Sequence, residues 1–214
     1  MRLSTSPPKV GEAELLALLD WKRTVFELYA AVRNSPDPRA GWDGWRAARD
    51  ELFRVHRQSP FPLDVRESFP GVPYFEYDPS ARLLADVRPV APETLAIGTS
   101  HPDPLEFTRF GLASFELQGH SLSLELYWLA GYGGGLFLPF TDTTSGDETY
   151  GGGRYLLDTV KGADLGMENG RLVLDFNFAY NPSCAYDAKW VCPLAPAQNR
   201  LPIAVRAGER LARG

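Results

Sequence analysis

The sequence lacks the features that mark several large classes of proteins. It has only two cysteines in 214 residues, Cys184 and Cys192, so it is not a small scaffold held together by disulfides. The longest uncharged stretch begins at Leu126 and ends before Asp142. This stretch contains four glycines and a proline, so it does not predict a membrane-spanning helix. The formal net charge of −5 argues against nucleic acid or an anionic membrane as the main partner.

Common catalytic and nucleotide-binding motifs are also missing. There is no GxxxxGK[ST], HExxH, GxSxG or CxxC, and the glycines from 131 to 135 lack the last glycine of GxGxxG. Residues 141–146 end on the glycine of a calcium loop but carry threonines in place of carboxylates. Residues 1–11 show no apolar core of the signal-peptide kind, so we expect a cytoplasmic protein. The sequence leaves its oligomeric state and its cofactors undetermined.

What is present indicates an ordinary globular chain. Hydrophobic residues make up 44% and charged residues 23%, close to globular averages. A chain of this length can form a core without metal or disulfide. We expect one structural unit, in which residues 1–68 form a helical appendage and residues 69–214 form a β domain.

The N-terminal part predicts two helices. One apolar stripe with spacings of three and four is formed by Leu18, Trp21, Val25, Leu28 and Val32. We interpret this stripe as core packing, with a seam for a partner helix as the alternative. The prolines within residues 35–38 end this helix. A second helix is expected from Asp43, as N-cap, to Arg57. Two helices of this size must pack on something else.

The remainder predicts β structure. Expected strands lie at residues 72–77, 82–88, 94–99, 105–110, 113–118, 121–129, 136–140, 154–160 and 172–178. Their regular spacing, with glycine turns and no helices between them, favours an antiparallel barrel or sandwich of about eight strands. Residues 181–200 contain three prolines and predict an ordered loop across the sheet.

Polar side chains gather within the apolar strands between residues 136 and 192. Asp175 and Asn177 alternate with apolar residues, which predicts that they share one face of a strand. Their burial would require polar partners. Arg154 follows three glycines, where the backbone can approach a ligand or another segment closely. Its guanidinium suits a carboxylate or a phosphate.

Several of these motifs resemble a known family. They are FLPFTD at 137–142, ETYGGGRYL at 148–156, DFN at 175–177, AYNPSCAY at 179–186, CPL at 192–194, NRLP at 199–202 and RAGE at 206–209. Together they resemble the domain of unknown function 1684, a family of uncharacterised bacterial proteins. A looser likeness extends over most of the chain. Since the family has no assigned activity, the resemblance implies little about function.

The polar residues allow several interpretations. Arg154 could anchor an anion beside an acid or base such as Asp142, Glu148 or Asp175, or it could close a structural salt-bridge network. The acidic residues near 142–148 could hold a divalent ion, although a solvated acidic turn is favoured, and we expect no metal site. A pocket for a ring or a sugar could be lined by aromatic residues including Tyr150, Tyr155, Tyr180, Tyr186 and Trp190.

The two cysteines are eight positions apart, and their favoured interpretation is buried structural thiols. Zinc ligation, a nucleophilic cysteine with His101 or His120 as base, and a local disulfide are the alternatives.

Three functions therefore remain open. The first is a domain that binds a small molecule, with an anionic ligand as one option. Its ligand-binding candidates are Arg154, Tyr150, Tyr155, Asp175, Asn177, Asn181 and Tyr186. The second is a hydrolase that uses a carboxylate, with Asp142, Glu148 and Asp175 as catalytic candidates. The third is a structural or interaction protein whose polar cluster only stabilises the fold.

Overall fold

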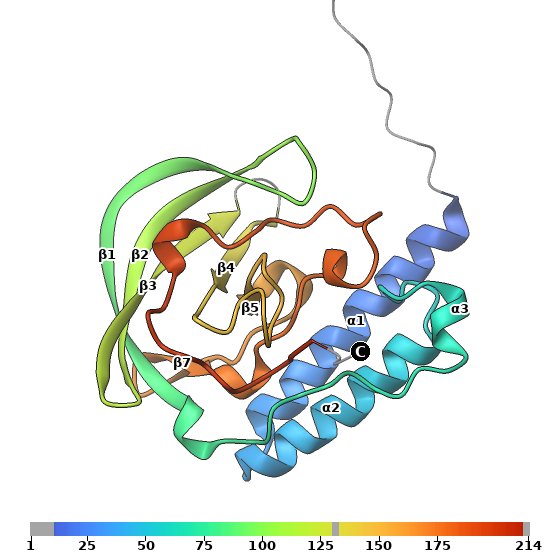
Figure 1. Ribbon diagram of the computed structural model, residues 1–214, viewed down its shortest axis with the longest axis horizontal. Coiled ribbons are helices and arrows are strands. Elements are labelled where there is room, and N and C mark those ends of the chain that lie inside the picture. Colours follow the sequence, from blue (N-terminus) through green and yellow to red (C-terminus); the bar gives the residue numbers. More distant parts are fainter. Residues whose placement is uncertain (1–10, 130–132, 212–214) are drawn as a thin grey trace, which may run out of the picture.

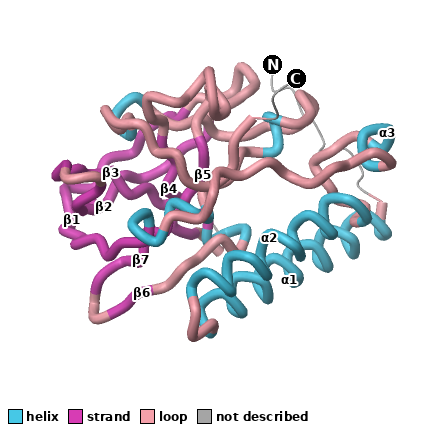
Figure 2. The backbone as a smooth tube through the Cα atoms, turned by 60° about the horizontal axis from the view of Figure 1, so that its bottom comes forward, coloured by secondary structure: helices cyan, strands magenta, loops and turns pink. Residues whose placement is uncertain are grey.

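Two long helices form the N-terminal part of the fold. The computed structural model describes residues 11–129 and 133–211, in which α1 spans Glu12–Asn34 and α2 spans Pro38–Val55. They lie side by side against the β part of the molecule, and the short α3 (Leu63–Arg66) follows them (Figures 1 and 2). The predicted helical pair is confirmed. Within the described ranges, no helix is both long enough and apolar enough to cross a lipid bilayer.

The start of α2 corrects one detail of the prediction. The N-cap is Asp37, not Asp43, and its carboxylate accepts a hydrogen bond from the Arg39 amide at 3.0 Å. Pro38 occupies the first helical position, where the absence of an N–H costs nothing. The same short proline segment therefore ends α1 and starts α2.

The apolar stripe of α1 is also placed differently from the prediction. Leu18, its first member, is 41% exposed, whereas Tyr29, outside the stripe, is 3% exposed. Val25, Leu28 and Val32 pack against the main core. Only the C-terminal half of the predicted stripe therefore faces the core.

The β part is a curled half-barrel of seven antiparallel strands. The strands are β1 (Arg82–Ile97), β2 (Leu105–Leu117), β3 (His120–Leu129), β4 (Gly135–Phe140), β5 (Arg154–Asp158), β6 (Met167–Glu168) and β7 (Arg171–Asp175). Their order in the sheet is β5-β4-β3-β2-β1-β7-β6. The mainly β, antiparallel fold class is confirmed.

Two of these strands are longer than the sequence pattern indicates. Residues 82–88 and 94–99 were expected as separate strands, yet β1 is continuous and its pairing with β2 shifts register between Pro89 and Glu93. The expected break within 105–118 is likewise a register shift, between Arg109 and Gly111 in the pairing of β2 with β3. Such irregularities interrupt the alternation of polar and apolar residues without ending the strand.

Two expected strands are different in the structure. Residues 72–77 contribute only an isolated bridge between Tyr74 and Glu209. The strand expected at 172–178 ends at Asp175, and residues 176–178 form a turn of 3₁₀ helix. Asp175 caps that turn, so Asp175 and Asn177 do not sit on one face of a strand as we expected.

The irregular C-terminal segment crosses the open end of the half-barrel (Figure 1). Asn199 holds the segment there, because the side-chain Nδ2 of Asn199 donates to the carbonyl oxygens of Pro139 at 2.8 Å and Glu125 at 3.0 Å. The Asn199 side-chain oxygen accepts from the Glu125 amide at 2.8 Å. The predicted ordered loop is therefore present, and it is tied to β3 and β4.

The helical pair shares its core with the β part. The rings of Trp45 in α2 and Phe178 lie 5.0 Å apart, and the indole of Trp42 donates to the Asn177 carbonyl at 2.8 Å. Tyr29 from α1 belongs to the same buried cluster as the sheet residues. The helices thus complete the core of the β part.

Candidate functional site

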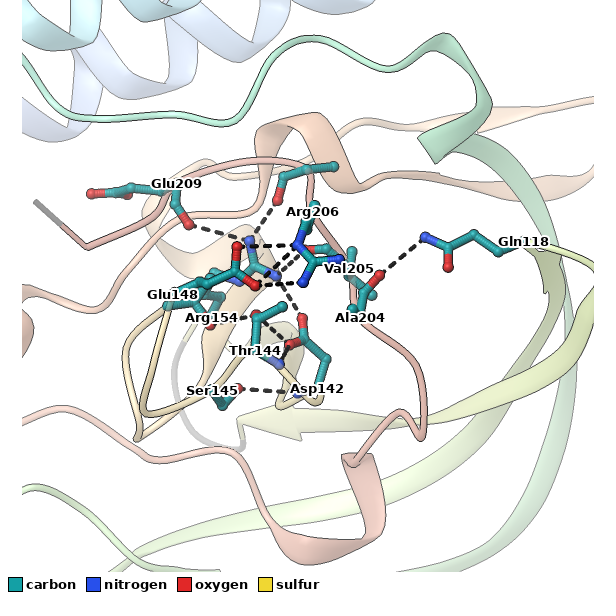
Figure 3. Close-up of polar contacts among 12 residues, drawn as sticks. Gln118, Asp142, Thr144, Ser145, Glu148, Arg154, Ala204, Val205, Arg206 and Glu209 are labelled. Atoms are coloured by element: carbon teal, nitrogen blue, oxygen red, sulfur yellow. Dashed lines mark hydrogen bonds and ion pairs between the residues drawn. The ribbon is translucent and has the colours of Figure 1, made fainter. Parts of the chain in front are cut away.

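Arg154 is the centre of a buried polar network (Figure 3). The side chain of Arg154 is 1% exposed and that of Asp142 is 0% exposed, with 2.7 Å between Arg154 Nη2 and Asp142 Oδ2. Arg154 also donates to the carbonyl oxygens of Ala207, Val205 and Glu209. Both terminal nitrogens of the guanidinium are therefore used inside the protein.

The glycine directly before Arg154 allows neighbouring segments to pack closely around this network. Gly153 has φ +92°, and a methyl group placed on it would lie 2.7 Å from the Phe140 carbonyl oxygen and 2.6 Å from Ala195 Cβ. The close approach anticipated from the glycine run is therefore made by neighbouring chain segments.

The carboxylate of Asp142 is also fully engaged. Its Oδ1 accepts from the amide of Thr144 at 2.6 Å and from the hydroxyl of the same residue. Glu148 is partly buried and pairs with the exposed Arg206, with 2.8 Å between Arg206 Nη2 and Glu148 Oε1. Within the described ranges, no three His, Cys, Asp or Glu side chains come together as metal ligands would.

Asp175 and Asn177 form a second polar unit at the end of β7. Asp175 Oδ1 accepts from the Asn177 amide at 3.0 Å and from Asn177 Nδ2 at 2.8 Å. Asn177 Oδ1 in turn accepts from the Asp78 amide at 2.9 Å. Burial raises the pKa of Asp175, and the two hydrogen bonds from Asn177 oppose that rise. These contacts fix the turn after β7 against the segment before β1.

A separate pocket lies between the two helices and the β part. Its volume is about 90 Å³, and it is bounded by α1, α2, Tyr155 of β5, residues 161–163 and residues 180–186. Seven of its lining residues are aromatic: Trp21, Tyr29, Trp45, Phe53, Tyr155, Tyr180 and Tyr186. Such an aromatic wall with a few polar groups is typical of small-molecule sites.

Two polar atoms of the lining residues lack a hydrogen bond. They are the hydroxyl oxygen of Tyr186 and the side-chain oxygen of Asn181, each buried and without a partner in the described part of the chain. A buried polar atom without a partner costs about 1–3 kcal/mol. Such atoms are uncommon in folded proteins, and these two belong to one pocket.

The charges at this pocket occur as balanced pairs. Arg49 lines the pocket and pairs with the buried Glu209, with 3.1 Å between Arg49 Nη2 and Glu209 Oε2. Lys161 lines it too and pairs with Asp158, with 3.4 Å between Lys161 Nζ and Asp158 Oδ2. Burial raises the pKa of the Glu209 carboxyl, and Arg49 opposes that rise. The pocket therefore carries no excess of either charge.

The structure brings only some of the sequence candidates together. Tyr155, Asn181 and Tyr186 line the pocket. The other candidates lie away from it: Arg154, Asp142, Glu148, Asp175, Asn177 and Tyr150. Of these, the hydroxyl of Tyr150 contacts the sulfur of Cys184 at 3.5 Å.

The helical half of the pocket was not predicted from the sequence. Trp21, Tyr29, Trp45 and Arg49 all line it, and none was a site candidate. A signal was present, because rings are unusually frequent on the inner faces of both helices. That signal does not distinguish core packing from a pocket wall.

Comparison with known proteins identifies similar chains but no function. A family model described as "Protein of unknown function (DUF1684)" matches residues 67–210. The solution NMR structure of an uncharacterised protein from Haloarcula marismortui is 38% identical, with a TM-score of 0.59, and the match covers 81% of this chain and 94% of that one. No curated protein is significantly similar to the chain.

Proposed function

Since the chain belongs to the DUF1684 family of proteins of unknown function, its geometry must indicate its role, and we propose that it binds a small molecule in the pocket between the helices and the β part. The observation that carries the proposal is the pair of unpartnered polar atoms, on Asn181 and Tyr186, at one aromatic pocket. A ligand that hydrogen-bonds to them would recover the free energy lost by their burial.

The size of the pocket limits what enters it. An apolar cavity of about 150 Å³ accommodates benzene. The present pocket, at about 90 Å³, is smaller than that, so its interior takes only the polar end or one edge of a ring-bearing ligand, and the rest of the ring lies at its open mouth. A larger ligand would extend past the exposed Lys161 at the rim.

The polar atoms define the chemistry of the ligand. Asn181 Oδ1 can only accept, so the ligand must present an N–H or O–H to it. The hydroxyl of Tyr186 can both donate and accept. Because Arg49 and Lys161 already pair with carboxylates, we propose a neutral amide or alcohol on a ring in place of the anion considered from the sequence.

The test compares three small probes of similar shape. Benzamide has a ring and an amide, benzoate carries a negative charge in place of the amide, and toluene has no polar group. We expect benzamide to shift the NMR amide signals of residues 180–186 and the indole signal of Trp45 at lower concentration than the other two probes. A site built for hydrogen bonds disfavours an analogue that lacks them.

The matched variants are Asn181→Ala and Asn34→Ala. Loss of the Asn181 acceptor should weaken benzamide binding by about fivefold to tenfold, the value of one hydrogen bond. Asn34 is exposed at the end of α1, so Asn34→Ala should bind as the unchanged protein does. Equal binding of benzamide and toluene, or shifts confined to other residues, would contradict the proposal.

Both terminal nitrogens of Arg154 are hydrogen-bonded within the protein, which supports a structural role for the pair of Arg154 and Asp142. Arg154 and Asp142 are buried and hold the C-terminal segment through three carbonyl oxygens. We propose that this network stabilises the fold, as in the third function considered from the sequence. The hydrolase alternative would need Asp142 free to act on a substrate, and both of its oxygens accept hydrogen bonds within the protein.

A further inference from the structure

The two cysteines lie together beside the pocket. Cys184 is partly exposed and Cys192 is 3% exposed, and both are free thiols. The thiol of Cys192 hydrogen-bonds to the sulfur of Cys184, and the Tyr150 hydroxyl contacts the same sulfur at 3.5 Å. A partly exposed cysteine is therefore backed by a buried thiol and a phenol.

The surrounding backbone holds the two sulfurs at this position. The amide of Cys192 donates to the Ser100 hydroxyl at 3.1 Å, and the Cys192 carbonyl accepts from the Ser100 amide at 2.9 Å. Cys184 sits in the 3₁₀ turn Ser183–Ala185, directly after Pro182. Cys192 is thus anchored to the segment that follows β1, while Cys184 lies on the loop that lines the pocket.

We propose that Cys184 is a peroxide-reactive thiol and that Cys192 is the resolving thiol that converts it into a disulfide. The assignment follows from their unequal exposure, from the side-chain hydrogen bond between them and from the contact of Tyr150 with Cys184. It differs from the buried structural thiols favoured from the sequence.

The chemistry of both thiols agrees with these roles. Hydrogen bonds from Cys192 and Tyr150 lower the pKa of Cys184, which favours its thiolate. The hydrogen bond to Cys184 and burial raise the pKa of Cys192, which keeps it protonated. Only the thiolate is a strong nucleophile, so the exposed sulfur reacts first.

The reaction with hydrogen peroxide balances in two steps. In the first, the Cys184 thiolate attacks one peroxide oxygen, the O–O bond breaks, an S–OH group forms, and the released hydroxide takes up a proton as water. In the second, the Cys192 sulfur attacks the oxidised sulfur, and the S–O bond breaks as the S–S bond forms. The leaving hydroxide takes the Cys192 proton as a second water. Two electrons pass from the thiols to the peroxide.

The test exposes the full chain to dilute hydrogen peroxide and follows it by intact mass and by iodoacetamide labelling. We expect the mass to fall by two hydrogens and both thiols to resist labelling, at a rate at least about tenfold above that of free cysteine. Dithiothreitol should restore both thiols. Oxidation no faster than that of free cysteine, or a chain whose two thiols remain open to labelling, would overturn the proposal.

Single variants assign the two roles. Cys192→Ser should stop at the sulfenic acid, seen as a gain of one oxygen and as a dimedone adduct on Cys184. Cys184→Ser should slow peroxide consumption to the rate of a buried thiol. Cys192→Ala replaces Cys192→Ser if the serine variant does not fold. Reaction of Cys184→Ser at the unchanged rate would reverse the assignment.

Tyr150→Phe keeps the ring and removes only the hydroxyl. We expect it to slow the first step severalfold without preventing the disulfide, because one hydrogen bond to the thiolate is lost. An unchanged rate of the first step would show that the Tyr150 hydroxyl does not activate Cys184.

Discussion

Arg49 of α2 and Glu209 near the end of the described chain form a buried ion pair, with 3.1 Å between Arg49 Nη2 and Glu209 Oε2. The same Glu209 oxygen accepts from the Asn181 amide at 2.8 Å. This carboxylate therefore joins the helical pair to the loop that lines the pocket.

Removal of either charge should leave the other buried without a counter-charge. We expect Arg49→Met and Glu209→Gln each to lower the free energy of unfolding by about 3–5 kcal/mol. The double variant should lose less than the sum of the two. Urea denaturation of all four chains measures this coupling, and simple additivity would show that the two side chains act independently.

The unpartnered hydroxyl of Tyr186 predicts a stabilising substitution. Tyr186→Phe removes a buried oxygen without a partner in the described chain and should raise the free energy of unfolding by about 1 kcal/mol. Tyr155→Phe is the matched control, because the Tyr155 hydroxyl donates to the Pro193 carbonyl at 2.5 Å. That variant should lose about 1 kcal/mol or more. Denaturation curves that rank the two in the opposite order would contradict the assignment of these hydroxyls.

The buried pair of Arg154 and Asp142 predicts that the Asp142 carboxylate stabilises the fold. Asp142→Asn should lower the free energy of unfolding by about 3–5 kcal/mol, since it leaves Arg154 buried without a counter-charge. Glu148→Gln changes a pair whose arginine is 62% exposed and should cost about 1 kcal/mol or less. Thermal unfolding of the two variants checks this contrast, and similar losses would place Glu148 within the network.

The glycine run before Arg154 offers a backbone test. Gly153→Ala places a methyl group against the Phe140 carbonyl at a φ of +92°, and it should cost at least about 2 kcal/mol. Gly151→Ala meets nothing closer than Gly146 Cα at 3.6 Å, so it should be tolerated. Equal melting temperatures for the two variants would show that the segments around Gly153 can move apart.

Asp175 predicts how stability depends on pH. Because burial raises its pKa in the folded chain, the folded state holds the proton more tightly than the unfolded state does. The contribution of Asp175 should therefore fall as pH rises from the ordinary carboxyl pKa, about 4, through the raised folded value.

Asp175→Asn keeps an oxygen that can accept from the Asn177 amide and removes the titration. The difference in unfolding free energy between Asp175→Asn and the unchanged protein should therefore increase over this pH range in favour of the variant. A difference that does not vary with pH would show that Asp175 has the same pKa in both states.

The sequence predicted the fold class better than it predicted the site. Local signals were sufficient for the existence of the helical pair and for the end of its first helix, which the prolines at 36 and 38 mark, but they placed the N-cap of the second helix at Asp43 in place of Asp37. They were insufficient at Pro89, because a register shift interrupts the alternation of polar and apolar residues just as the end of a strand does. The pocket could not be predicted from local sequence patterns, since its walls come from α1, α2 and residues 180–186, which are far apart in the chain. Of the seven ligand-binding candidates, Tyr155, Asn181 and Tyr186 line it, whereas Arg154 is enclosed by its own network.

The shared pocket wall has a consequence for the evolution of related chains. The family model begins at residue 67, yet α1 and α2, which precede it, supply four of the seven aromatic lining residues. The rings of Phe53 and Tyr186 lie 5.9 Å apart across this boundary. A change of ring size on one side must be matched on the other, so these two positions should covary among relatives. The ligand specificity of each relative should then depend on pairs of residues, of which one lies in the region that the family model matches and the other lies before it.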